Sequence, residues 1–322
     1  MKIKKIHLKF ILVCLIASIP LAIQGGFADS DVYYEQAIYT WTNGLLGGGW
    51  GVFQQTGKLE FGMQFLFYIE GLVCQDKTFF LIANFILVNL CLYSLLLKCS
   101  EISTVKVTSV TIFILIFTYY TYSNTLYVWR TVFALYFFFT CIHAKMVKDK
   151  FIFFVLSVTF HYTALLFYVA YYVAKYLPDK KTSSIFYVVV GTVSGYLCIA
   201  YLPFIKYFVS GGNSDIFLEA QGEYLKRFII NVSFLFILFS SYINSYDVKK
   251  KNLFKMCILL CSLSVAFSMN WQLSWRLFAP AALLGVPLIL SSNYKNIPYY
   301  MMFLSVFPTL KLMGLLIQGI SP

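Results

Sequence analysis

The chain has 322 residues, of which 60% are hydrophobic and only 12% are charged, with a net charge of +12. Soluble domains are nearer half apolar and a quarter charged, so this composition excludes a soluble globular protein and indicates one that is surrounded by lipid. The lysines lie between the apolar runs rather than in one patch, which excludes nucleic acid as a partner. The eight cysteines are scattered, mostly within apolar runs, and predict no disulfide framework.

The N-terminus carries basic residues, MKIKKIHLKF, followed by an apolar run to Ile23. This order resembles a signal peptide, with GFA before Asp29 as a cleavage site. The many later apolar runs favour an uncleaved first transmembrane helix instead.

A membrane span needs about 20 apolar residues. The sequence predicts an all-α, polytopic transmembrane bundle that crosses nine or ten times, with residues 1–322 as a single membrane domain. The predicted spans are 10–24, 79–97, 107–123, 126–144, 185–209, 227–246, 256–275, 277–292 and 299–317.

Three further segments need separate interpretations. Segment 61–73 would be only about 20 Å long as a helix, and 151–175 has His161 in its middle. The GGGWG stretch at 47–51 is interpreted as a flexible loop turn.

The lysine clusters distinguish between the possible topologies. The first cluster ends at Lys9, and the others lie at 145–150, at 175–181 and at 249–255. All four are expected on the cytoplasmic side. Every cluster stays inside only if 61–73 does not cross and 151–175 dips outward to about His161 and returns. Irregular backbone at membrane depth must be buried in protein or line a wet cavity, so this topology predicts an outward-facing cavity.

The arginines are distributed differently from the lysines. Only Arg130, Arg227 and Arg276 occur, and all three lie inside or at the edge of apolar runs. Intramembrane charge is a functional hypothesis by default, and the planar guanidinium suits phosphate. In the topology above all three fall on the outer side, and they predict a site for a multiply charged anion such as a pyrophosphate.

Other polar residues share that outer side: His161, Asp29, Asp31, Glu35 and Glu60, and an acidic loop with Asp215, Glu219 and Glu223. Simpler interpretations stay open for all of these groups. The arginines can snorkel to the headgroups, His161 can be a buried residue satisfied by a neighbouring helix, and the carboxylates of loop 25–60 can be ordinary solvated groups.

Five motifs, in chain order, resemble those of the EpsG-like and Wzy-type polysaccharide (O-antigen) polymerases of bacterial membranes. ADSDVYYEQAIY has an Asp followed by Tyr, either Asp29 with Tyr33 or Asp31 with Tyr34; KLEFGMQFLF has Glu60 and Gly62, with Phe61 where the family has Pro. WRTVFALYFFF contains Arg130, with Thr131 in place of Gln. FHYTALLF (160–167) is the closest match, and WRLFAPAALL (275–284) supplies the late Arg276.

The resemblance implies a GT-C-like glycosyltransferase of the bacterial cytoplasmic (inner) membrane, of the kind used in lipopolysaccharide biosynthesis. It would join oligosaccharide repeat units carried on undecaprenyl diphosphate at the outer face, beside membrane lipids, a flippase and a chain-length regulator. The donor is already activated, so no nucleotide sugar, cofactor or metal is expected.

In this interpretation Arg130, Arg276 and Arg227 bind the diphosphate, and Tyr33 and Tyr34 contact the sugar. The general base is drawn from Asp29, His161, Asp31 and Glu60, with Asp29 and His161 favoured. A lipid-linked oligosaccharide flippase or transporter, an O-antigen ligase and a membrane acyltransferase remain as alternatives. A flippase would more often show internal repeats, and the sequence has none.

Overall fold

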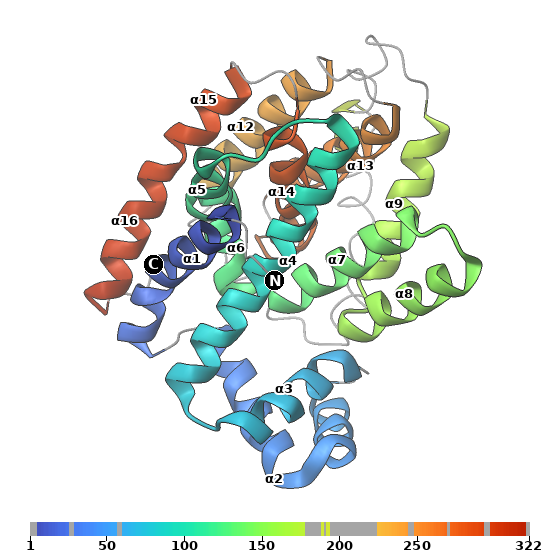
Figure 1. The fold of residues 1–322 in the computed structure, drawn as a ribbon. Coiled ribbons are helices and arrows are strands. Elements are labelled where there is room, and N and C mark those ends of the chain that lie inside the picture. The colour runs from blue at the N-terminus through green and yellow to red at the C-terminus, as the bar shows by residue number, and fades with distance from the viewer. Residues whose placement is uncertain are drawn as a thin grey trace. The chain divides into compact units, whose positions relative to one another are not determined.

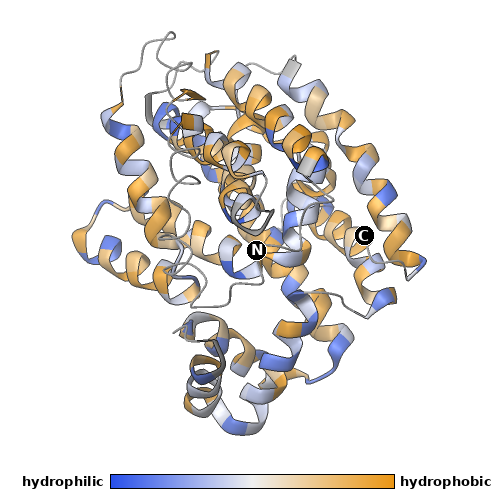
Figure 2. Cartoon of the chain, turned by 180° about the vertical axis from the view of Figure 1, so that it is seen from behind, coloured by the Kyte–Doolittle hydropathy of each residue, from blue (hydrophilic) through white to orange (hydrophobic). Residues whose placement is uncertain are grey.

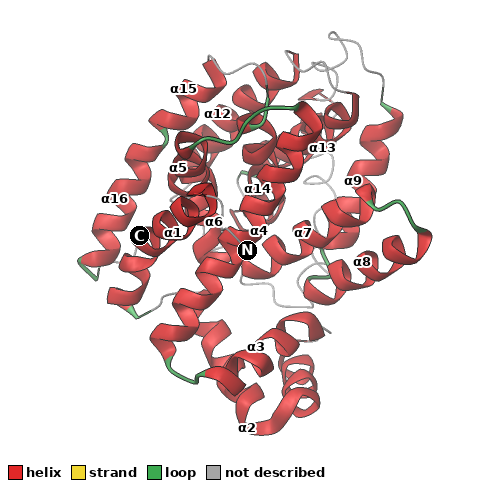
Figure 3. Ribbon diagram, viewed as in Figure 1, coloured by secondary structure: helices red, strands yellow, loops and turns green. Residues whose placement is uncertain are grey.

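The structure, a computed structural model, describes residues 5–25, 29–56, 60–177, 188–189, 191–193, 224–243, 248–268, 271–292 and 297–319. Every element labelled in these ranges is a helix (Figure 3), so the all-α prediction is confirmed for this part of the chain. Hydrophobic residues dominate most of the helices (Figure 2).

Contacts divide the chain into two compact units, Met1–Tyr168 with Tyr300–Pro322, and Val169–Tyr299. Unit 1 contains, in chain order, α1 (Lys5–Gln24), α2 (Asp29–Thr56), α3 (Phe61–Val73), α4 (Lys77–Ser103), α5 (Ser109–Phe117), α6 (Tyr119–Tyr127), α7 (Trp129–His143), α8 (Val147–Phe160) and α16 (Val306–Ile317). Within it α1 packs against α4, α5 and α16, α7 packs against α8, and α3 contacts α2 and α8 (Figure 1).

Helix α2 reverses direction at Gly44, whose φ of 72° and ψ of 174° are a conformation that essentially only glycine adopts. A Cβ added to Gly48 would lie 2.8 Å from the Cα of Thr40, although eight residues of straight helix span about 12 Å. The second half of α2 therefore packs back along the first half. The interpretation of 47–51 as a flexible loop is wrong, because these glycines are helical and their missing side chains permit the close approach.

Helices α5 and α6 break at Thr118, inside the predicted span 107–123. The break lies against a second one at Ser305, between α15 (Ile297–Leu304) and α16: the Tyr119 amide donates to the Ser305 carbonyl at 3.1 Å, and the hydroxyls of Thr118 and Ser305 are hydrogen-bonded. Backbone groups freed by one break are thus satisfied by the other, as the absence of water at membrane depth requires.

A second break separates α6 from α7 at Val128, where the two helices bend by 111°. It divides the chain close to the predicted start of span 126–144 and leaves Arg130 as the second residue of α7. The amide of Val128 still donates to the carbonyl of Asn124 at 2.9 Å, so the bend leaves this group paired.

The chain also reverses at His161, between α8 and α9 (Ala164–Tyr176). The rings of Phe154 and Tyr168 are 5.0 Å apart, whereas these residues would be separated by about 21 Å along a straight helix. The predicted turn near His161 is therefore confirmed as a chain reversal. Its position as a dip into the membrane from the outside stays a prediction.

Unit 2 is built on α12 (Tyr224–Ile243), α13 (Val248–Ala266) and α14 (Trp271–Leu290), which all contact one another. Buried Asn231 joins them, because its amide donates to the hydroxyl of Ser264 at 2.6 Å and to that of Ser274 at 2.9 Å. The ammonium of Lys250, 2% exposed, donates to the carbonyl of Ser291 at 2.9 Å, just after the C-terminus of α14. A cation at this end complements the helix dipole.

Within the described ranges, four helical segments are long and apolar enough to cross a membrane: Lys5–Gln24, Lys77–Ser103, Leu225–Ile243 and Pro298–Ile317. The bent pair α6–α7 makes five if it counts as one span. These account for four or five of the nine or ten predicted crossings, and most of predicted span 185–209 lies outside the described residues. Segment 61–73 forms helix α3 with the predicted bounds and is too short to join them. The division into one membrane domain stays a prediction.

Candidate active site

Three helix ends in unit 1 bring together residues that lie far apart in the sequence. Glu60 is the N-cap of α3, Arg130 follows the break that starts α7, and His161 is the C-cap of α8. Helix ends leave backbone groups without partners inside the helix. Each of these three side chains therefore lies where the regular helical hydrogen bonding stops.

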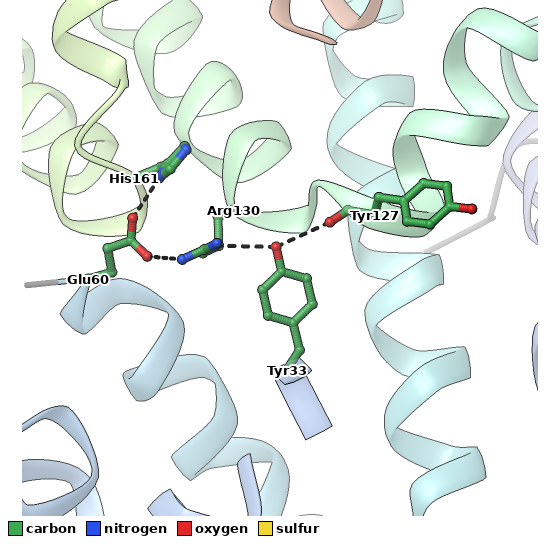
Figure 4. A network of polar contacts seen from close by, with 5 residues as sticks. All are labelled: Tyr33, Glu60, Tyr127, Arg130 and His161. Carbon is green, nitrogen blue, oxygen red and sulfur yellow. Dashed lines mark hydrogen bonds and ion pairs between the residues drawn. The ribbon is translucent and has the colours of Figure 1, made fainter. Parts of the chain in front are cut away.

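Glu60 is the centre of the cluster (Figure 4). One carboxylate oxygen, Oε2, forms an ion pair with Nη1 of Arg130, and the other, Oε1, lies 2.6 Å from Nδ1 of His161. The Glu60 side chain is only 3% exposed, against 24% for Arg130 and 13% for His161. The carboxylate is thus enclosed, and its two partners are the members of the cluster that remain reachable.

The charge state of Glu60 follows from these contacts. Burial by itself would raise the pKa of Glu60, but the hydrogen bond from His161 and the charge of Arg130 outweigh it and hold the pKa below its usual value. A carboxylate that stays ionised only accepts hydrogen bonds. The short contact therefore places a proton on Nδ1 of His161, so Nε2 is the nitrogen of the ring at which a further proton can be gained or lost.

Tyr33 holds Arg130 from the other side. Its hydroxyl accepts from Nε of Arg130 at 3.3 Å and donates to the carbonyl of Tyr127 at 3.2 Å. The ring stacks on Trp129 with centroids 5.0 Å apart, and burial raises the pKa of Tyr33, so the phenol keeps its proton. Tyr33 is 2% exposed, so its ring packs in the core, and the sugar contact stays a prediction.

A close approach of two helices delivers Glu60 to His161. A Cβ added to Gly62 would lie 2.7 Å from the ring of Phe160. Because Gly62 has no side chain, the start of α3 can reach the end of α8. This gives a physical reason for the glycine two residues after Glu60.

Asp29, Asp31 and Tyr34, the other predicted site residues of α2, lie in its first turns. Asp29 is exposed in the first turn of α2, and its charge is one of the influences that raise the pKa of Tyr33. Asp31 forms an ion pair with Lys77 at 2.9 Å, with both side chains 41% exposed. The Lys77 ammonium also lies 5.5 Å from the ring centre of Tyr34.

Asp29 and Asp31 are two residues apart, a spacing that can present two carboxylates to a cation. Lys77 already neutralises Asp31. Among the described residues, no group of three or more His, Cys, Asp and Glu side chains is placed to hold a metal ion.

The two remaining arginines belong to unit 2. Arg227, in the first turns of α12, lies over the ring of Trp275 with its Cζ 5.1 Å from the ring centre. Arg276 is exposed on α14. The acidic residues Asp215, Glu219 and Glu223 lie outside the described residues.

Sequence reasoning missed Trp129 and the backbone carbonyl of Tyr127, which complete the support of Arg130 through Tyr33. The adjacent Trp-Arg pair was the available signal. The role of this pair depends on the bend at Val128, and no local sequence pattern predicts that bend.

Comparison of the chain with protein-family models, with curated proteins and with solved structures found no match.

The cluster combines an ionised carboxylate, an imidazole that it orients and a guanidinium. In such an arrangement the imidazole can take a proton from a hydroxyl, and the guanidinium can stabilise developing negative charge.

Proposed function

We propose that the chain is a membrane glycosyltransferase of GT-C-like architecture that polymerises oligosaccharide repeat units carried on undecaprenyl diphosphate, at the outer face of a bacterial cytoplasmic membrane. One observation carries this proposal. Glu60, Arg130 and His161 come from three of the motifs that resemble the polymerase family, and they meet in one hydrogen-bonded cluster. Residues with merely structural roles in three separate helices need not converge in this way.

The reaction breaks the bond between the anomeric carbon of the growing chain and the oxygen of its lipid diphosphate. A hydroxyl oxygen of the acceptor unit forms the new glycosidic bond. The acceptor loses a proton to a base, and the electron pair of the broken bond leaves with the undecaprenyl diphosphate. Because the leaving group is already activated, neither ATP nor a nucleotide sugar takes part.

His161 is the base in this scheme, because Glu60 fixes the tautomer that leaves Nε2 basic. An imidazole works well as a base near neutral pH. Glu60 orients the ring and stabilises the imidazolium that forms when the proton arrives, in the manner of the carboxylate of a catalytic triad. Of Asp29 and His161, the two bases that the sequence leaves open, we propose His161, because its hydrogen bond with Glu60 supports this role.

Arg130 has a double role in the proposal. Nη1 holds Glu60 and Nε contacts Tyr33, while the side chain remains 24% exposed. A guanidinium is suited to an anionic oxygen of the diphosphate, and we assign this contact to Arg130. The assignment of Arg276 and Arg227 to the diphosphate stays a prediction from the sequence.

Deletion of the gene in its host tests the proposal by the length of the surface polysaccharide on a gel. Loss of a polymerase leaves single units available to a ligase, so the expected surface carries one repeat unit. A bare surface with units accumulating on the cytoplasmic leaflet would indicate a flippase. Single units that reach the outer face but are never attached would indicate a ligase.

A further inference from the structure

Helix α3 has an unusual distribution of side chains. Its exposed residues are all large and apolar: Phe61, Phe65, Ile69, Leu72 and Val73. Its buried face includes two polar residues, Gln64 and Glu70, which are 2% and 7% exposed. A helix on the surface of a water-soluble protein has the opposite arrangement, with the apolar stripe toward the core.

The polar residues of the inner face have partners inside the protein. Oε1 of Gln64 accepts from the hydroxyl of Thr40 at 2.5 Å, and Oε2 of Glu70 accepts from the amide of Asn84 at 3.1 Å. The inward orientation of α3 is therefore fixed by specific contacts with α2 and α4. Its apolar face points outward as a consequence.

The position of α3 in the chain limits what can cover this face. Only residues 74–76 separate the end of α3 from Lys77, where the apolar helix α4 begins. Three residues of extended chain reach about 10 Å, so α3 must lie close to the level at which α4 enters the membrane. With 13 residues α3 is too short to cross.

The neighbouring half of α2 has matching properties. No charged residue occurs from 36 to 57, and on the part of α2 that follows Gly44 the exposed residues include Leu46, 79% exposed, and Trp50, 57% exposed. These two are one helical turn apart. Tryptophan beside aliphatic residues, without charge, is typical of segments at the boundary between headgroups and acyl chains.

We infer that α3 lies in the plane of the membrane, with Phe61, Phe65, Ile69, Leu72 and Val73 immersed in the lipid of the leaflet where α4 begins. The partner of this surface is thus the acyl-chain boundary of a bilayer. Because Glu60 directly precedes α3, the same immersion fixes the depth of the carboxylate relative to the headgroups. The inference stands on the arrangement of α2, α3 and α4 and does not require the proposed transferase activity.

Nitroxide scanning in proteoliposomes tests it. In a variant with all eight cysteines replaced, single cysteines at positions 65, 69 and 72 receive a spin label. Collision rates are then measured with molecular oxygen, which partitions into lipid, and with a water-soluble nickel chelate. Two reference positions are the exposed Glu35 of α2 for water and Leu15, in the middle of the apolar helix α1, for deep lipid.

The labels on α3 are expected to collide more with oxygen than with nickel chelate, at depths between those of Leu15 and Glu35. Nickel accessibility equal to that of Glu35 would place the face in water and overturn the inference. Low accessibility to both reagents would show that protein covers the face, a second copy of the chain included, and would overturn it as well. The thermal unfolding midpoint of each labelled protein, compared with that of the unlabelled one, shows that the fold is retained.

Discussion

The candidate site depends on Glu60, because its carboxylate contacts both the imidazole of His161 and the guanidinium of Arg130. Replacing one partner of a buried ion pair leaves the other charge uncompensated. The roles of Glu60 and His161 are therefore best separated by variants that keep shape and change chemistry.

His161→Gln and Glu60→Gln are expected to lower chain extension by about 10²–10⁴-fold, the usual contribution of a general base. His161→Gln removes the base, whereas Glu60→Gln removes the charge that fixes its tautomer. The measurement is the rate of chain extension by protein that retains its wild-type thermal midpoint. His143→Gln on α7 and Glu101→Gln on α4 are matched controls. Equal activity of His161→Gln and His143→Gln would contradict the assigned base.

Tyr33 acts on the site through Arg130. Tyr33→Phe keeps the ring on Trp129 but removes the hydroxyl that lies between Arg130 and the Tyr127 carbonyl, which costs about 1 kcal/mol for a typical hydrogen bond. A drop in turnover of about fivefold with intact folding is expected, with a larger drop for Arg130→Lys, which lacks the planar fork. If Tyr33 contacts sugar instead, Tyr33→Phe changes the KM for the acceptor and leaves turnover unchanged.

At the scale of elements, α3 contains a second buried carboxylate with a different environment. Burial raises the pKa of Glu70 to about 7, opposed by the hydrogen bond from Asn84. Oε1 of Glu70 and Oδ1 of Asn84 are both buried without a hydrogen-bond partner. A proton on Glu70 removes the buried charge and turns Oε1 into a donor, so the protonated form suits this pocket.

The pH dependence of stability follows from that shift. The folded-state pKa lies above the ordinary value, so the free energy of unfolding falls as pH rises from about 4.5 to about 7, by up to about 3 kcal/mol. Glu70→Gln does not titrate and is expected to raise the thermal midpoint at pH 8 but not at pH 4. Glu101→Gln, exposed on α4, is the control. An equal shift at both pH values would contradict this account.

The sequence allowed the all-α class, the bounds of α3 and the chain reversal near His161 to be predicted. These rest on apolar run length and on a polar residue inside an apolar run. The breaks at Thr118 and Val128 could not be predicted, since the partner of the first lies at Ser305 and neither contains proline or glycine. The glycine stretch was misread because permissive glycines serve loops and close helix packing equally.

Glu60, Arg130 and His161 could be selected as unusual polar residues near apolar runs, but their pairing depends on three helix ends meeting. The sequence predicts Tyr33 as a sugar contact but gives no sign that its ring packs against Trp129. Burial of an aromatic residue beside carboxylates is a tertiary property that sequence spacing does not encode.

At the scale of the whole molecule, the predicted topology places Lys148 and Lys250 in the cytoplasm and Asp31 and Asp215 outside. The structure refines the choice of probes, because Lys250 is buried against Ser291 whereas Lys148 is exposed. Single cysteines at 148 and 251 are expected to resist a membrane-impermeant maleimide in intact cells, and one at 35 is expected to react. Strong labelling at 148 in intact cells would overturn the topology, and labelling after permeabilisation is the positive control.

Chain extension by the purified protein tests the central claim most directly. Detergent-purified protein is reconstituted in liposomes with undecaprenyl-diphosphate-linked repeat units from the host, without ATP or nucleotide sugar. The account predicts that products with several units form while undecaprenyl diphosphate is released in proportion, and that His161→Gln liposomes yield neither. Unchanged single units with wild-type protein, while the same units extend in membranes from which it came, would contradict the account.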